Sequence, residues 1–168
     1  KDLVRTICKS TTYQLAAEPN QYNARDKQNF SRYYPKRLNA EVLLDSIDYV
    51  TGSASNFNGL PVGAKAVQIP DNGVNSYFLT VFGRPEGASA CECERSQEAN
   101  LAQSLHLLNA PEMKAKLAAA TGRAERLAKE EKPIEAKVRE LYLAAFSREP
   151  RPQELKTALD YLNEPGTA

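Results

Sequence analysis

Residues 36–51 read KRLNAEVLLDSIDYVT, and they carry the strongest structural signal in the chain. Their apolar residues recur at the three- and four-residue spacing that lines one face of an α-helix. These residues are Ala40, Leu43, Leu44, Ile47 and Val50. Gly52 follows at once and can cap the C-terminus, because glycine readily adopts the left-handed conformation that ends many helices. The pattern predicts a core helix over 36–51.

The same periodicity predicts helices on both sides of this segment. Before it, a stripe that begins at Leu3 and Ile7 reaches Leu15, and Pro19 ends it. After it, residues 74–82 favour a short helix. Ser96 can cap a further helix that carries Ala99, Ala102, Leu105 and Leu108 and stops near residue 110. Pro111 then opens a segment to residue 131 that forms either one bent helix or two short ones.

The C-terminal part of the sequence predicts a helical hairpin. Two apolar stripes, at 134–145 and 155–162, flank the short link SREPRP at 147–152. A tight link marked by prolines favours two antiparallel helices that pack against each other.

Two segments lack a regular period. Residues 20–35 are polar and aromatic and predict an ordered loop, and residues 52–73 hold four glycines and two prolines. Within the second segment, residues 66–69 could form a short extended piece. We therefore predict an all-α single domain over 1–168, with a long irregular Gly/Pro-rich insertion and a C-terminal helical hairpin around one core. Because the chain begins abruptly, we expect this domain to be excised from a larger multidomain protein.

Composition and charge exclude several classes of function. The 168 residues include no apolar run long enough to span a membrane. The formal net charge is +1, which provides no field to attract nucleic acid or an anionic membrane. The sequence has no phosphate loop, dinucleotide fingerprint, nucleophile elbow, zinc-protease motif or c-type haem attachment motif, so it indicates no cofactor. These observations favour a non-catalytic function.

Unusual chemistry is concentrated in the segment that holds two of the three cysteines, Cys91 and Cys93. Two thiols one residue apart could bind a soft metal, form a strained redox disulfide, or leave one thiol to pair with Cys8. A zinc site would need every cysteine together with His106, the one histidine of the chain. A further alternative is that the thiols are unbridged and lie in a structural loop. We interpret His106 as a packed histidine, because it lies among leucines.

Three carboxylates, Glu41, Asp45 and Asp48, lie on the helix face opposite the apolar stripe of 36–51. Such carboxylates can act as acid and base, but they more often form ion pairs. Arg32 and Arg37 lie close in sequence, and we predict a structural ion-pair cluster of the five residues. The same basic segment, RYYPKR at 32–37, could stack on single-stranded nucleic acid, but it is short and isolated.

Several motifs in order give the chain a family resemblance. They are NFSRYYPKRLNAEVLLD at 29–45, SYFLTVFGRP at 76–85, CECER at 91–95, LAQSLHLLN at 101–109 and REPRPQEL at 148–155. With these motifs the chain resembles the planctomycete-specific PSD domain, domain-of-unknown-function family fifteen-fifty-three. The resemblance implies a C-terminal module of large exported proteins, located in the cell envelope or periplasm, that follows a companion domain and often a cytochrome-c-like domain. It brings no catalytic residues.

Three function hypotheses follow. The first is a non-catalytic interaction or scaffolding module whose partners are other domains of the same polypeptide, including a cytochrome-c-like domain. The second is a redox or metal accessory domain that uses Cys91 and Cys93. The third is an enzyme of unknown, hydrolytic reaction, with Glu41, Asp45 or the 52–73 loop at its cleft.

Overall fold

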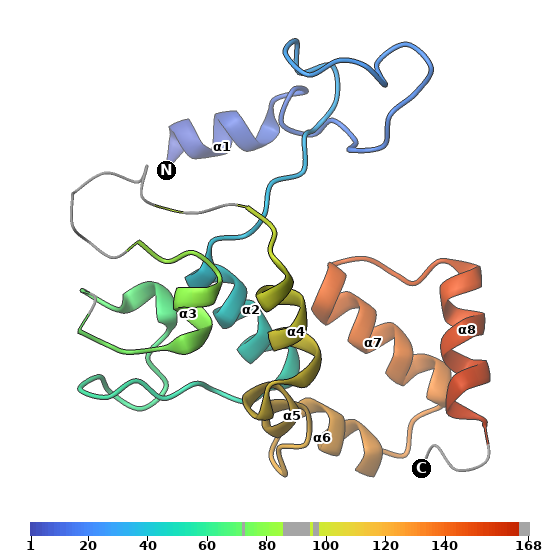
Figure 1. Ribbon diagram of the computed structural model, residues 1–168. Coiled ribbons are helices and arrows are strands. Elements are labelled where there is room, and N and C mark those ends of the chain that lie inside the picture. The colour runs from blue at the N-terminus through green and yellow to red at the C-terminus, as the bar shows by residue number, and fades with distance from the viewer. Residues whose placement is uncertain (72, 86–94, 96–97, 165–168) are drawn as a thin grey trace. The chain divides into compact units, whose positions relative to one another are not determined.

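The computed structural model describes residues 1–71, 73–85, 95 and 98–164, and its regular secondary structure is helical, with no strand among these residues (Figure 1). The all-α class predicted from the sequence is confirmed. The helices are α1 (Asp2–Lys9), α2 (Ala40–Thr51), α3 (Tyr77–Val81), α4 (Leu101–Asn109), α5 (Pro111–Leu117), α6 (Arg123–Lys129), α7 (Ile134–Phe146) and α8 (Pro152–Leu162), with a 3₁₀ turn, η1 (Ala66–Gln68). None of these helices has the length and apolar character required to cross a membrane.

The chain divides into two compact units, Lys1–Arg37 and Leu38–Ala168. In the first unit, α1 ends at Lys9 instead of continuing to Leu15, so the predicted length of this helix is wrong. The backbone adopts an extended conformation at Ser10, whose hydroxyl donates to the carbonyl of Ile7 (2.7 Å). This side-chain bond competes with the next helical turn, which explains the early end.

A single aspartate organises the loop that follows α1. The Asp26 carboxylate accepts the Ser31 hydroxyl and the backbone N–H groups of Gln28, Asn29 and Ser31. These hydrogen bonds, that of the Ser31 hydroxyl first, hold the pKa of Asp26 well below its ordinary value. They also hold Phe30 in a left-handed conformation with φ of 53°, which is uncommon for an aromatic residue. The ordered loop predicted at 20–35 is confirmed.

The core of the second unit forms around α2. Ala40 and Leu44 of this helix are fully buried against Phe78 and Leu79 of α3, and Met113 of α5 joins the same cluster. The helix begins at Ala40, four residues later than predicted, and it contacts η1, α3, α5, α6 and α7. Residues 40–51 therefore form the central helix that the periodicity of 36–51 indicated.

Two glycines bring the end of α2 against the start of α6. Gly52 caps α2 at φ of 69°, and its N–H donates to the carbonyl of Asp48 (2.9 Å), as predicted. A Cβ on Gly122 would lie 3.0 Å from the Thr51 carbonyl oxygen, so this approach requires glycine. From α6, the Arg123 guanidinium donates to the carbonyls of Tyr49 and Val50, at 3.0 and 2.8 Å. It satisfies the last carbonyls of α2, which have no partner within the helix.

The connection from α2 to α3 is irregular, as predicted, but residues 66–68 form the 3₁₀ turn η1 and not an extended piece. Asp45 of α2 explains the difference. Its carboxylate accepts the backbone N–H groups of Ala66 (2.7 Å) and Val67 (3.2 Å), which caps the turn from outside. A partner 21 residues away leaves no local signal in the sequence.

Helix α4 begins at Leu101, later than the start predicted after Ser96, which itself lies outside the described residues. Asn100 caps it instead, because its side-chain oxygen accepts the N–H of Gln103 (2.9 Å) and the Gln103 side chain accepts the N–H of Asn100. Pro111 opens α5 as predicted, and α5 and α6 are two separate short helices.

The predicted C-terminal hairpin is confirmed as α7 and α8, which lie side by side and antiparallel (Figure 1). Ser147 adopts a left-handed conformation at the end of α7, and Arg151 and Pro152 open α8. Val138 of α7 is buried, whereas the outward surface carries ion pairs such as that between Arg139 and Glu135 (2.8 Å).

Candidate functional site

The three carboxylates of α2 each have a separate partner. Glu41 pairs with Arg95 (2.8 Å), Asp45 caps η1, and Asp48 pairs with Lys116 of α5 (2.6 Å). Glu41 and Arg95 lie in a cavity of about 210 Å³ that Arg84 also lines. The structure thus uses all three carboxylates in contacts within the second unit and does not gather them at one point.

Arg32 and Arg37, the predicted cationic partners, belong to the first unit. The Arg32 guanidinium lies over the ring of Tyr34 (5.1 Å to the centroid) and donates to the carbonyl of Ala17 (3.3 Å). Arg32 and Tyr34, with Tyr33 and Phe30, line an apolar groove of about 270 Å³. The clustering of Arg32 and Arg37 with the acids of α2 stays a prediction.

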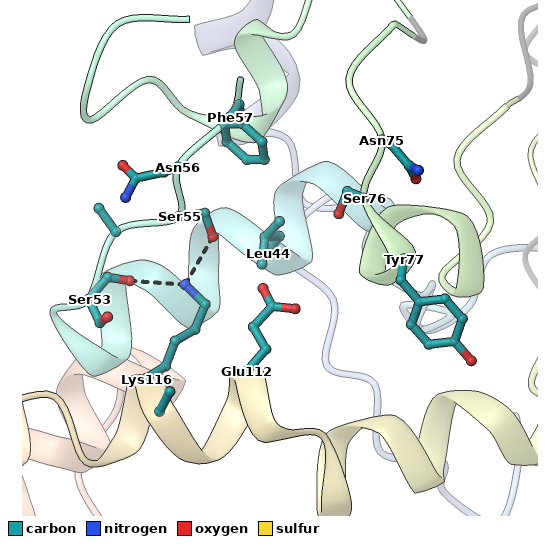
Figure 2. Close-up of a pocket in the computed structure, with 12 residues that line it drawn as sticks. Leu44, Ser53, Ser55, Asn56, Phe57, Asn75, Ser76, Tyr77, Glu112 and Lys116 are labelled. Atoms are coloured by element: carbon teal, nitrogen blue, oxygen red, sulfur yellow. Dashed lines mark hydrogen bonds between the residues drawn. The ribbon is translucent and has the colours of Figure 1, made fainter. Parts of the chain in front are cut away.

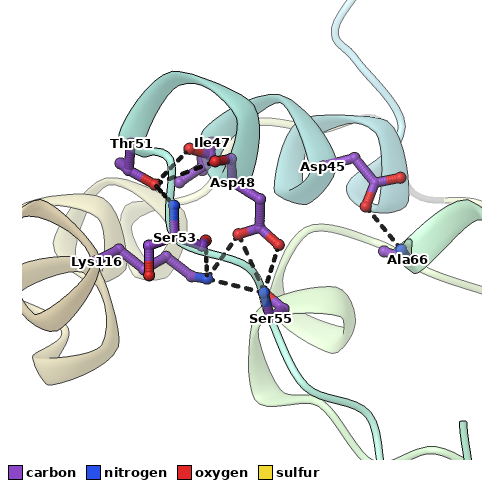
Figure 3. Close-up of polar contacts among 8 residues, drawn as sticks. All are labelled: Asp45, Ile47, Asp48, Thr51, Ser53, Ser55, Ala66 and Lys116. Atoms are coloured by element: carbon purple, nitrogen blue, oxygen red, sulfur yellow. Dashed lines mark hydrogen bonds and ion pairs between the residues drawn. The ribbon is translucent and has the colours of Figure 1, made fainter. Parts of the chain in front are cut away.

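The pair between Asp48 and Lys116 is the centre of a buried polar network (Figure 3). Lys116 is 6% exposed, and its ammonium group also donates to the carbonyl of Ser53 (3.3 Å) and the hydroxyl of Ser55 (2.9 Å). Asp48 in turn accepts the backbone N–H of Ser55 (2.7 Å) and its hydroxyl (3.1 Å). Each donor of the ammonium has an acceptor, as burial of a charge requires.

This network fixes one wall of a cavity of about 410 Å³, which Figure 2 shows. The loop 53–57 forms that wall, residues 75–77 form the opposite one, and α5 forms the floor with Glu112 and Lys116. Leu44 of α2 lies at the back of the cavity. The enzyme hypothesis expected a cleft where the acids of α2 meet the 52–73 loop; here Asp48 lies behind the wall, bonded to Ser55.

Several exposed polar side chains that line this cavity have no hydrogen-bond partner among the described residues. The Glu112 carboxylate, the Asn56 and Asn75 amides and the Tyr77 hydroxyl form no hydrogen bond or ion pair with any residue that the structure describes. In Figure 2 the Glu112 side chain rises from α5 into the space between Lys116 and Tyr77. Among the described residues, Glu112 therefore supplies an exposed and unpaired carboxylate beside a fully engaged lysine, and no sequence pattern indicated it.

His106 is packed, as predicted, against a cluster of aromatic rings. Its ring centroid lies 5.4 Å from that of Tyr77, 5.5 Å from Phe78 and 6.3 Å from Phe82. Its Nε2 atom is buried and has no hydrogen-bond partner among the described residues. The contacts are those of a packed aromatic residue.

Helix α4 turns its leucines towards solvent and buries a glutamine. Gln103 is 4% exposed, and its amide donates to the carbonyls of Val81 (3.0 Å) and Glu98 (3.2 Å). Leu101, Leu105 and Leu108 are 74%, 50% and 73% exposed. We call these three side chains the leucine face. The predicted helix that carries Leu105 and Leu108 is present, but both leucines are exposed, because periodicity identifies an apolar face and not whether that face is buried.

The predicted cysteine site lies largely outside the described residues. Cys91 and Cys93 fall in the part of the chain that the structure does not describe, and Cys8 is exposed on α1. The proposed redox or disulfide pairing of these three thiols stays a prediction. Within the described ranges, no three His, Cys, Asp or Glu side chains are grouped so that they could hold a metal ion.

A comparison with protein-family models found one match that spans nearly the whole chain. The model described as PSD1, protein of unknown function (DUF1553), matches residues 1–74 and 64–162. Searches of curated proteins and of solved structures found no match.

Proposed function

We propose that this chain, which belongs to the PSD1 family of proteins of unknown function (DUF1553), is a non-catalytic interaction module that binds through α4. The observation that carries the proposal is the leucine face, which is exposed although the same helix buries a glutamine. A solvent-facing helix normally turns charged and polar residues outward. The nine residues of α4 include no Asp, Glu, Lys or Arg.

The orientation of α4 is held by specific contacts. Asn100 and Gln103 cap its first turn, the Gln103 amide donates to Val81 and Glu98, and His106 packs on the aromatic cluster. Rotation of the leucines into the core would leave two carbonyls and the glutamine amide without partners, which is costly in a buried position. The leucine face therefore faces outward in the stable state and is available to a partner.

The chemistry of this surface defines the partner. Three leucines at positions i, i+4 and i+7 with no adjacent charge on the helix fit a second apolar helix face, which buries them by ridge-into-groove packing. We propose that this partner lies in another domain of the same polypeptide, where linkage raises its effective concentration. The family resemblance supports a cytochrome-c-like domain as the partner and the cell envelope or periplasm as the location.

The polar network of α2 and α5 supports a non-catalytic function. Asp48 and Lys116 carry the charges that acid and base chemistry would need, but their hydrogen bonds all go to groups of the fold. An engaged and buried pair of this kind holds a loop in place and is poorly placed to exchange protons with a substrate.

The test uses a triple variant, Leu101→Gln, Leu105→Gln and Leu108→Gln, and the other domains of the full-length polypeptide expressed separately. We expect the unchanged chain to bind one of these domains and the triple variant to bind at least about tenfold more weakly, by isothermal titration calorimetry. The matched control changes three exposed apolar residues on other surfaces, Val62→Gln, Leu117→Gln and Leu143→Gln, and should keep binding. Circular dichroism checks the fold of both variants.

Two binding results would contradict this proposal, and a third result would contradict its choice of partner. One is the absence of association at the highest attainable concentrations, and the other is binding that the triple variant retains in full. A dimer of the chain in sedimentation that the triple variant abolishes would assign the leucine face to a second copy and would also overturn the proposed partner.

A further inference from the structure

We propose that the cavity between the loop 53–57, residues 75–77 and α5 binds a hexosamine unit, a sugar ring that carries a protonated amine. This site lies apart from the leucine face and does not depend on it. Its volume of about 410 Å³ falls in the range of about 300 to 1,000 Å³ that is usual for small-molecule sites. Its lining combines amides, hydroxyl groups, one carboxylate, one ammonium group and the two aromatic rings of Phe57 and Tyr77.

The wall of the cavity is held in place before any ligand arrives. Asp48 accepts the backbone N–H and the hydroxyl of Ser55, and Lys116 donates to the Ser53 carbonyl and the Ser55 hydroxyl. On the opposite wall, the Ser76 hydroxyl accepts the N–H of Leu79 and caps α3. Both walls are therefore anchored to helices of the core, and ordering them adds little cost to binding.

The unpartnered groups match the pattern of a sugar. The amides of Asn56 and Asn75 can each donate and accept, as neighbouring sugar hydroxyls also do. The Tyr77 ring is 67% exposed, and His106 supports it from the α4 side. It offers an apolar surface for the flat face of a sugar ring, while its hydroxyl can form a further hydrogen bond.

The charge of the lining selects the amine. Lys116 contributes no free donor, because its ammonium group already donates to Asp48, Ser53 and Ser55. Glu112 is then the unbalanced charge of the cavity, and a protonated amine can pair with its carboxylate. The same carboxylate repels a sugar acid. The structure thus predicts the order of affinity as glucosamine, then glucose, then glucuronate.

The experiment is a titration of the 168-residue chain, followed by backbone amide NMR, with glucosamine, glucose and glucuronate as the probes. The pH is mildly acidic, so that the glucosamine amine carries its proton. We expect the largest shifts at residues 53–57 and 75–77, and glucosamine affinity about three- to tenfold above that of glucose. Ethanolamine, an amine without a sugar ring, serves as a fourth probe and should bind more weakly than glucosamine.

Two matched variants test whether the charge of Glu112 causes the preference for the amine. Glu112→Gln should remove the preference for glucosamine while glucose binding persists, and Glu131→Gln, which makes the same charge change at an exposed site outside the cavity, should leave the preference intact. Tyr77→Ala should weaken all the sugars. The proposal is overturned if no sugar shifts these amides, if ethanolamine binds as tightly as glucosamine, or if Glu112→Gln retains the full preference.

Discussion

The region around α2, α4 and α5 and the hairpin of α7 and α8 differ in where they place polar side chains. In the first region, Lys116 and Gln103 are buried and the leucine face is exposed. In the hairpin, Val138 is buried and charged residues pair on the outside. The hairpin also exposes Leu143, Phe146 and Leu162, but among its described residues it buries no charged or polar side chain. The first region positions a loop and a helix face, and its polar contacts are the ones that matter most for the fold.

The largest expected effect comes from breaking the buried pair of that first region. Lys116→Met keeps most of the side-chain volume but leaves the Asp48 carboxylate without its counter-charge. We expect a loss of about 3 to 5 kcal/mol in the free energy of unfolding, measured by urea denaturation. The double variant Asp48→Asn with Lys116→Met should recover part of the loss, because no unpaired charge remains. A loss below about 1 kcal/mol in the single variant would contradict a structural role for the pair.

The next largest expected effect comes from removing the buried amide of α4. Gln103→Leu removes the amide that donates to the Val81 and Glu98 carbonyls and leaves both without that donor. We expect a loss of about 1 to 3 kcal/mol in the same measurement, although leucine is the more hydrophobic residue. Gln153→Leu, at an exposed position on α8, is the control and should stay within about 0.5 kcal/mol. A stabilised Gln103→Leu protein would show that the glutamine does not fix the helix.

Removing a surface ion pair of the hairpin should change the free energy of unfolding far less. Arg139 donates to Glu135 (2.8 Å) and Glu149 (3.0 Å), but all three side chains are about half exposed to water. We expect Arg139→Gln to shift the urea midpoint only slightly, because exposed ion pairs contribute little. Sodium chloride at about 1 M should remove the remaining difference. A shift as large as that of Lys116→Met would erase the contrast between the two regions.

The smallest effect is a pH dependence at the start of α8. Two hydrogen bonds from the Arg148 guanidinium, and one from the N–H of Arg151, lower the pKa of Glu154 from 4.5 to about 2. A lowered pKa in the folded state means stability that is present above pH 4.5 and is lost as the pH falls towards 2. Glu154→Gln should flatten this part of the profile of Tm against pH. Equal slopes in both proteins would contradict the lowered pKa.

The periodic parts of the fold could be predicted from the sequence, and the contacts between distant segments could not. The stripe of α2, its glycine cap and the two stripes of the hairpin are local patterns that burial preserves. By contrast, η1 depends on Asp45, which lies 21 residues before it. Which face of α4 is buried depends on the carbonyls of Val81 and Glu98, which accept from Gln103. Ser96 lies outside the described residues, and α4 begins five residues after it, where Asn100 and Gln103 form the cap.

The candidate site was predictable only in part. Asp48 was singled out as a member of an acidic stripe, and it does form an ion pair, but with Lys116, 68 residues away. Lys116 and Glu112 belong to a short helix rich in charged residues, where the sequence gives no means to tell a buried lysine from a solvated one. Only the packing of α5 against α2 and the 53–57 loop makes that distinction.

The burial of Lys116 also makes it a reporter of local opening. Its amine is held by three acceptors and shielded from water, so an acetylating reagent can reach it only while α5 and the loop 53–57 are apart. Exposed lysines such as Lys129 react at once under the same conditions and give the reference rate. The delay at Lys116, read by mass spectrometry of the labelled peptides, therefore measures how often the wall of the cavity opens while the rest of the chain stays folded.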